Sequence, residues 1–194
     1  MANGLEVLSD VCLSGGATGA DLQFGMCAGT AGHTVIHWSF EGHDTDCPPQ
    51  ERVVLSEGQL KEADDILPIV AKRLKRVVPS LKRTRNLLRR NFYQINTAER
   101  VYAVASIGDD GKVNGGTGWA VEMYKLRHDD RPPELYVFDQ SDGLWYIWKD
   151  RFWSRIDSPP KPHGVWAGIG SRELQTNGKE AIRTLLGYVK PSPQ

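Results

Sequence analysis

Residues 11–21 read VCLSGGATGAD, and this stretch decides the fold, because an apolar run ends in a glycine-rich turn that leads directly into a helical pattern. The apolar run predicts a strand over Val7–Ser14, and the residues after the turn predict a helix over Ala20–Ala31. Glycine allows the tight turn between them and lets a ligand approach the backbone without meeting a Cβ atom. A strand, a glycine turn and a helix in this order indicate an α/β protein.

The same alternation of apolar runs and helical patterns continues along the chain. The helical region Ser56–Thr97 contains Pro68 and Pro79, where we expect a helix to start, kink or end. Further strands are expected at His33–Phe40, Arg100–Ile107, Glu134–Asp139 and Val165–Ile169, helices at Trp119–His128 and around Lys179–Val189, and a loop at Glu41–Gln50. This spacing predicts a mainly parallel sheet flanked by helices.

Length and composition are those of one domain over residues 1–194. A hydrophobic content of 40% argues against global disorder, and the apolar runs are too short to span a membrane. No secretory leader is recognisable, and three cysteines (Cys12, Cys27 and Cys47) are too few for a disulfide scaffold, so a cytoplasmic location is expected. The aromatic segment 142–156 is expected to form a hairpin or an extra edge element, and residues 190–194 a frayed tail.

The charges balance overall but not locally. The 24 basic and 24 acidic residues cancel, which argues against a dedicated nucleic-acid-binding surface. Nine basic residues and no acidic ones lie between positions 72 and 90: Lys72, Arg73, Lys75, Arg76, Lys82, Arg83, Arg85, Arg89 and Arg90. Most of them are expected on a solvated helix face, although one or two of them could face a phosphate.

Three glycine-rich turns follow expected strands. They are Ser14–Asp21, Asn114–Gly118 and Gly168–Glu173, and none is a Walker loop, because no Gly-Lys-Ser/Thr follows. In an open α/β sheet, ligands bind beyond the carboxyl ends of the strands, where helix N-termini attract anions. Three such turns in one small domain predict a phosphate or nucleotide site.

These turns resemble motifs of the SMF/LOG superfamily, a Rossmann-like group. The stretch SGGATGAD (14–21) is similar to its SGGAxGAD turn, and GGTGWAVE (115–122) is similar to the PGGxGTxxE motif of the Lonely Guy phosphoribohydrolases. Arg90 and Asn91 lie where those enzymes carry a catalytic Arg-Lys and the DNA-processing relatives carry Arg-Asn. The group also includes nucleotide-sensing domains of bacterial defence systems.

The chain departs from the family pattern in residues and in order. Asn114, Trp119 and Asn91 replace the motif proline, threonine and lysine, which puts the reaction in doubt. Family members begin with a strand that ends in Gly-Ser-Arg, whereas here VWAGIGSREL (165–174) comes last. This order predicts a circular permutation in which the strand Val165–Ile169 lies between Val11–Leu13 and Val101–Val104.

The resemblance assigns catalysis to Glu122 and Arg90. Glu122 is expected in the first turn of its helix, from where its carboxylate would reach a ligand held by the glycine loop and act on an N-glycosidic bond. Arg90 would hold the phosphate, and Asp21 would bind a ribose hydroxyl. The residues expected to bind substrate are Ser14, Gly15, Gly16, Thr18, Asp21, Asn91, Gly115, Gly116, Thr117, Gly118, Gly170, Ser171 and Arg172.

Several alternatives stay open at this point. Glu122, Arg90 and Asp21 also suit ordinary helix positions, and Trp119 either stacks on a base or belongs to the core. No metal and no cofactor are expected, since the cluster of histidine, aspartate and cysteine at positions 33–47 fits no zinc spacing. The leading hypothesis is hydrolysis of a nucleotide N-glycosidic bond. The alternatives are a binder that senses or sequesters a signalling nucleotide, and a single-strand DNA binder. A homo-oligomer is possible.

Overall fold

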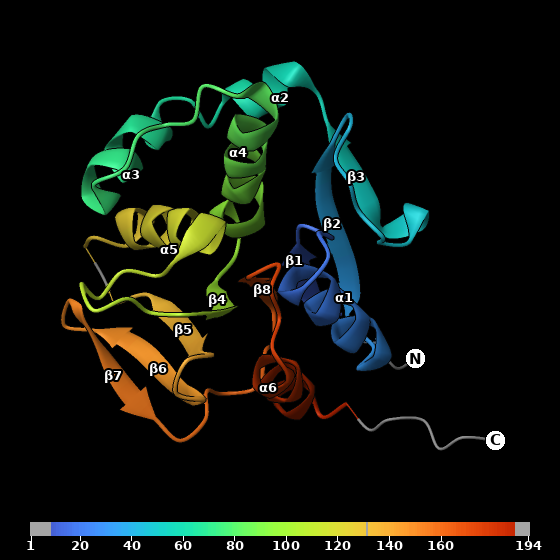
Figure 1. The fold of residues 1–194 in the computed structure, drawn as a ribbon. Coiled ribbons are helices and arrows are strands. Elements are labelled where there is room, and N and C mark those ends of the chain that lie inside the picture. Colours follow the sequence, from blue (N-terminus) through green and yellow to red (C-terminus); the bar gives the residue numbers. More distant parts are fainter. Residues whose placement is uncertain (1–8, 131, 189–194) are drawn as a thin grey trace, which may run out of the picture.

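The computed structural model describes residues 9–130 and 132–188, which form an α/β fold around an eight-stranded sheet (Figure 1). The strand order is β3-β2-β1-β8-β4-β5-β6-β7, and the neighbours from β3 to β5 are all parallel, whereas β6 and β7 pair antiparallel. The strands are β1 (Val11–Ser14), β2 (Thr34–Phe40), β3 (Arg52–Leu55), β4 (Arg100–Ala105), β5 (Glu134–Asp139), β6 (Leu144–Lys149), β7 (Phe152–Ile156) and β8 (Val165–Gly170).

Helices cover both faces of the sheet. Helices α1 and α6 pack together on one face, and α3, α4 and α5 pack on the other (Figure 1). The helices are α1 (Ala20–Thr30), α2 (Glu57–Lys61), α3 (Ile66–Leu74), α4 (Lys82–Asn96), α5 (Gly115–Arg127) and α6 (Thr176–Leu186), with a 3-10 turn at Pro49–Glu51. The expected fold class, a mainly parallel sheet flanked by helices, is confirmed. None of the helices in residues 9–130 and 132–188 is long and apolar enough to cross a bilayer.

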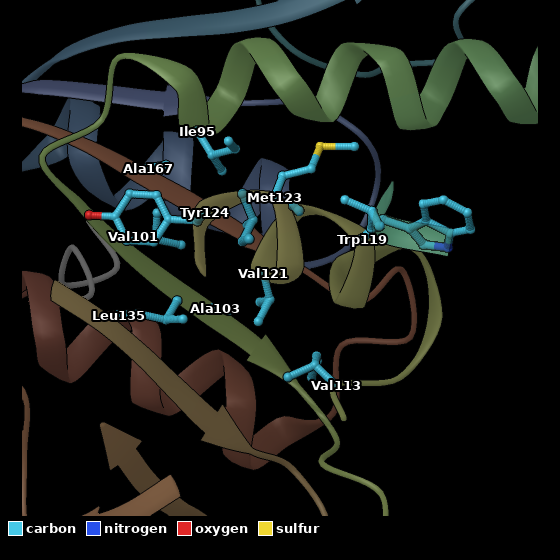
Figure 2. Close-up of a cluster of buried hydrophobic side chains, with 14 of the residues drawn as sticks. Ile95, Val101, Ala103, Val113, Trp119, Val121, Met123, Tyr124, Leu135 and Ala167 are labelled. Atoms are coloured by element: carbon cyan, nitrogen blue, oxygen red, sulfur yellow. The ribbon is translucent and has the colours of Figure 1, made fainter. Parts of the chain in front are cut away.

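The alternation of side chains along β4 builds a core on each face. Val101 and Ala103 pack against α5, where Val121 points toward them and Met123 points toward α4 (Figure 2). Tyr102 belongs to the second core, with residues of α1 and α6. All five side chains are fully buried. Full burial of a large apolar side chain contributes roughly 1.5–3 kcal/mol, so these two layers hold β4 and its neighbours in place.

Strand β8 lies at the centre of the sheet although it is the last strand in the chain. Val11 of β1 pairs with Val165 on one side, and Val101 of β4 pairs with Ala167 on the other. The expected position of Val165–Ile169 between these two strands is therefore confirmed. A circular permutation would account for the position and stays a prediction. Strand β1 begins at Val11 and is shorter than expected, and α6 begins and ends earlier than expected, at Thr176 and Leu186. The expected strand start at Val7, the expected helix end at Val189 and the frayed tail at 190–194 lie outside the described residues.

Two elements differ from the sequence expectation. Helix α5 begins at Gly115, four residues before the expected start at Trp119. Glycine is a poor helix former, so the sequence does not indicate this start. In the structure, Gly118 lies so close to the carbonyl oxygen of Val113 that a Cβ atom at position 118 would overlap this oxygen. The close packing therefore requires glycine within the helix. The second difference is β3, which was not expected: it is a short edge strand with three exposed residues and carries little apolar signal. Segment 142–156 contains the hairpin of β6 and β7 at the opposite edge.

Candidate functional site

A cavity of about 550 Å³ lies at the carboxyl ends of β1, β8 and β4. Helix α1 leads from β1 to β2 on one side of this point, and α5 leads from β4 to β5 on the other, so the cavity occupies the switch point of the sheet. Its polar lining consists of Asp21, Thr84, Arg90, Asn91, Gln94, Ser106, Asn114, Thr117, Gln140, Ser171, Arg172, Glu173 and Gln175. Its apolar lining consists of Ala17, Leu87, Leu88, Ala105, Ala120 and Ile169. We call it the switch-point cavity.

Arg90 is the buried cation of the switch-point cavity. Helix α4 places its side chain at only 4% exposure, where Nη1 donates to Oδ2 of Asp21 (3.0 Å) and to Oε1 of Gln94. Burial lowers the pKa of Arg90, and the neighbouring carboxylate of Asp21 partly offsets this effect. Its Nε atom has no hydrogen-bond partner among the described residues. The guanidinium lines the cavity, and Asp21 and Gln94 contact it only at Nη1, so an anionic ligand there would meet a buried positive charge.

Asp21 connects several elements of the cavity wall through its carboxylate oxygens. Oδ1 accepts from the backbone N–H of Gly170 (2.9 Å), and Oδ2 accepts from Gln94 Nε2 (3.2 Å) as well as from Arg90. The carboxylate thus joins α1, α4 and the end of β8, and it orients the guanidinium. Gly15 leaves room for this arrangement, because a Cβ atom there would overlap Nη1 of Arg90. The expected contact of Asp21 with a ribose hydroxyl would compete with these three protein donors.

The N-terminus of α5 forms the opposite wall. The Cβ positions of Gly115 and Gly116 have no atom within 4 Å, so the backbone here is open to a ligand. The first N–H groups of a helix have no partner within the helix and carry a partial positive charge. Asn91 Nδ2 donates to the Gly116 carbonyl (3.2 Å), and Arg76 Nη1 donates to the Gly115 carbonyl (2.8 Å), so both side chains fix this turn.

The turn after β8 closes the third side. Ser171 uses its carbonyl oxygen to accept from the N–H of Ala20 (3.0 Å), which covers the start of α1. Gln140, which follows β5 directly, donates from Nε2 to the Glu173 carbonyl (3.2 Å) and accepts at Oε1 from the N–H of Gln175 (2.8 Å). The side chains of Arg172 and Glu173 are exposed at this edge. The turn is thus tied to the sheet by its backbone, while its charged side chains remain accessible.

Part of the first glycine turn shapes the cavity without lining it. Ser14 Oγ donates to the Asp21 carbonyl (2.8 Å), Thr45 Oγ1 donates to the Gly16 carbonyl, and Thr18 Oγ1 donates to Asp46 Oδ2 (3.1 Å). These contacts face the neighbouring loop or the protein interior. Of the residues expected to bind substrate, the ones outside the lining are Ser14, Gly15, Gly16, Thr18 and Gly118, and the ones within it are Asp21, Asn91, Gly115, Gly116, Thr117, Gly170, Ser171 and Arg172.

Glu122 lies in a second cavity of about 540 Å³, away from the switch-point cavity. Because α5 begins at Gly115, Glu122 is two turns into the helix, and its expected position in the first turn is wrong. Its Oε1 accepts from Lys125 Nζ (2.8 Å), and that ammonium lies 3.4 Å from the ring centre of Trp148 and 4.7 Å from that of Trp153. The structure therefore does not bring Glu122 and Arg90 together.

Gln94, Gln140 and Gln175 line the cavity and were not among the expected site residues. Two of them carry a signal in the sequence. Gln94 lies four residues after Arg90 and therefore on the same helix face, and Gln140 directly follows β5, at the strand end where ligands bind in such sheets. Gln175 has no comparable signal, because only the turn after β8 brings it to the cavity.

The remaining candidates from the sequence are Trp119 and the cluster of histidine, aspartate and cysteine at positions 33–47. Trp119 is 5% exposed and belongs to the apolar core cluster that also contains Val121 and Met123 (Figure 2), which decides between its two interpretations. Burial lowers the pKa of His37 to about 4 and that of His43 to about 3, with further lowering by Arg90. Within residues 9–130 and 132–188, no three histidine, cysteine, aspartate or glutamate side chains are grouped to hold a metal ion.

The fold and the switch-point cavity together define an α/β protein with a cavity of mixed polar and apolar lining between two diverging βαβ connections. Comparisons of the chain with protein-family models, with curated proteins and with solved structures find no match. The resemblance to the SMF/LOG superfamily therefore rests on the sequence motifs alone.

Proposed function

We propose that this protein binds a nucleotide in the switch-point cavity. The volume of about 550 Å³ falls in the range of roughly 300–1,000 Å³ that small-molecule sites occupy. The apolar side chains of Leu87, Leu88 and Ile169 offer a surface for a base, and the side-chain amides around them offer hydrogen bonds for its edge. Arg90 and the N-terminus of α5 would hold the phosphate.

Arg90 is the observation that carries this proposal. Burying a charged group is unfavourable unless its hydrogen bonds are satisfied, and Asp21 and Gln94 bind only Nη1 of this guanidinium. A guanidinium that lines the cavity and is contacted only at Nη1 favours a ligand with a negatively charged oxygen. A phosphate also complements the helix N-terminus on the facing wall.

Calorimetry with nucleoside mono-, di- and triphosphates tests the proposal on the full chain. Arg90→Gln removes the buried charge and is expected to weaken nucleotide binding by about tenfold or more, because a charge-assisted bond contributes roughly 1.5–3 kcal/mol. Arg89→Gln is the matched control: Arg89 is also buried on α4 but binds Asp64 outside the cavity. Equal loss in both folded variants, or no binding by the native chain, would contradict the proposal.

Hydrolysis of the N-glycosidic bond is the second candidate, and one lining residue favours it. Glu173 lines the switch-point cavity with an exposed carboxylate on the turn after β8. A carboxylate beside the bond could orient water or stabilise the oxocarbenium-like state. Chromatography of the calorimetry samples for free base separates the two functions: released base supports the hydrolase, and an intact bound nucleotide supports the binder.

A further inference from the structure

The ionisable side chains that line the switch-point cavity balance one another. Among the described residues they are two guanidinium groups, Arg90 and Arg172, and two carboxylates, Asp21 and Glu173. Arg90 and Asp21 are buried and bonded to each other at 3.0 Å, so that pair brings no net charge to a ligand. Arg172 and Glu173 are exposed and carry opposite charges, so together they add no net charge to the lining. The lining therefore provides no excess of full positive charge.

What attracts an anion here is limited to partial charges and the donors of one guanidinium. The N-terminus of α5 acts as roughly half an elementary charge, and the open backbone at Gly115 and Gly116 lets a phosphate reach it. The guanidinium of Arg90 lines the cavity and adds hydrogen-bond donors besides Nη1. Arg76 is the neighbouring cation, but it binds the carbonyl oxygens of Gly115 and Val113, is partly exposed and lies outside the lining. This combination favours a phosphate of the lowest charge.

We propose, on the basis of the nucleotide-binding function above, that the ligand's phosphate is a diester carrying a single negative charge, as in a cyclic mononucleotide. A phosphate monoester carries about −1.5 to −2 at neutral pH, and a triphosphate carries more, so either would place uncompensated charge in the cavity. A nucleoside without phosphate would leave the Arg90 donor and the α5 terminus unused. The volume of the cavity suits one nucleoside with its phosphate.

Calorimetry on the full chain, at constant ionic strength, tests this charge selection with ligands that share a base. The adenine series is adenosine, 3′,5′-cyclic AMP, AMP and ATP, and the guanine, cytosine and uracil series are measured in the same way. For the preferred base, we expect the cyclic nucleotide to bind about tenfold tighter than the monophosphate and the triphosphate, because one uncompensated charge in a partly buried site lowers the affinity by about that factor. We expect a similar advantage over the nucleoside, which lacks the phosphate that Arg90 and the α5 N-terminus would bind.

Two charge variants provide the matched comparison, and both change exposed side chains. Glu173→Gln adds one net positive charge and should improve the affinity for the monophosphate relative to the cyclic nucleotide several-fold. Arg172→Gln should move this ratio in the opposite direction. A nucleoside, monophosphate or triphosphate that binds tightest, or a ratio that neither variant changes, would overturn the diester inference while nucleotide binding stands. If no compound of any series binds, nucleotide binding itself fails.

Discussion

Arg89 and Arg90 are neighbours on α4, yet their side chains have different roles. Arg89 uses Nε and Nη2 on Asp64 (2.7 and 2.6 Å) and Nη1 on Asn86 (3.0 Å), so its donors are consumed within the protein. Arg90 points to the switch-point cavity and retains an unpartnered Nε. Successive helix residues differ by about 100° in direction, and this rotation alone separates a structural arginine from a candidate ligand-binding one.

Two buried histidines make stability depend on pH. The pKa of His37 falls to about 4 and that of His43 to about 3, against about 6.5 in the unfolded chain, so both are neutral in the folded protein at pH 6. Glu51 lies 3.5 Å from His37 but forms no hydrogen bond with it, and desolvation prevails. Because the unfolded state binds more protons between pH 6.5 and 4, stability is lost as the pH falls through this window.

The expected loss is about 2 kcal/mol for each histidine between pH 7 and pH 5. Urea unfolding of the native chain and of His37→Gln, measured at both values, checks it. The variant should lose about 2 kcal/mol less stability over this interval than the native chain. Parallel loss in the two proteins would show that His37 titrates normally in the folded state.

At the scale of elements, helix α5 joins two cavities. Its N-terminus lines the switch-point cavity, and two turns later Glu122 and Lys125 line the other cavity, beside the hairpin of β6 and β7. The ammonium of Lys125 lies between the carboxylate of Glu122 and the rings of Trp148 and Trp153. These contacts tie the hairpin to the helix, which is a structural role for the carboxylate that the sequence motif assigned to catalysis.

We expect Glu122→Gln to reduce stability without changing nucleotide affinity. Removing one partner of a buried ion pair typically costs about 3–5 kcal/mol, because the other charge stays buried. Urea unfolding followed by tryptophan fluorescence gives the stability, and calorimetry gives the affinity. The double variant Glu122→Gln/Lys125→Met, which removes both charges, should recover much of the loss. A folded Glu122→Gln protein that loses ligand turnover would restore the catalytic assignment of this residue.

The basic run between positions 72 and 90 is largely used inside the molecule. Arg73 pairs with Asp129 (2.6 Å), and Lys82 pairs with Glu57 (3.1 Å). Arg76 and Arg85 donate to backbone carbonyl oxygens. Exposed pairs of this kind contribute at most about 1 kcal/mol each, and Lys72, Lys75 and Arg83 remain exposed on the surface. Arg90 is the member of the run that lines the switch-point cavity.

At the scale of the whole molecule, β8 is the central strand around which the parallel part of the sheet is built. Gly170 at its end lies so close to the carbonyl oxygen of Val104 in β4 and to Ala20 in α1 that a Cβ atom would overlap both. The N–H of Gly170 binds Asp21, so the same residue also anchors Arg90. The geometry of the switch-point cavity therefore depends on how closely three elements from distant parts of the chain approach one another.

Gly170→Ala should lower the free energy of unfolding by about 1–3 kcal/mol or more, because the added methyl meets backbone that cannot move aside. Gly116→Ala is the matched control: it lies in another glycine turn of the same cavity but has open space at its Cβ position. We expect that variant to stay within about 1 kcal/mol of the native chain. Urea unfolding of the two purified proteins measures both effects, and similar stabilities would contradict the packing argument.

Much of the fold is predictable from local patterns. Strand β5 and helix α1 carry their periodicity in consecutive residues, and their predicted bounds agree closely with the structure. The start of α5 was not predictable, because glycine has a low helix propensity and α5 begins with two glycines. Strand β3 was not predictable, because three of its four residues are exposed and it shows no alternating apolar pattern. The candidate site was predictable where its residues directly follow strands, as at Gly115, Gly170 and Gln140.

The sequence by itself determined the class of fold and the strand ends at which the cavity lies, because hydrophobic periodicity and glycine turns are local properties of the chain. The central place of β8 was predicted from the order of the motifs that resemble the SMF/LOG superfamily. Only the tertiary structure decided which side chains share a cavity. Arg90 meets Asp21 across 69 positions, whereas Glu122, four residues after Gly118, faces a different cavity. The physical reason is that helix phase and the packing of layers set the direction of each side chain, and both depend on contacts between residues that are distant in the sequence.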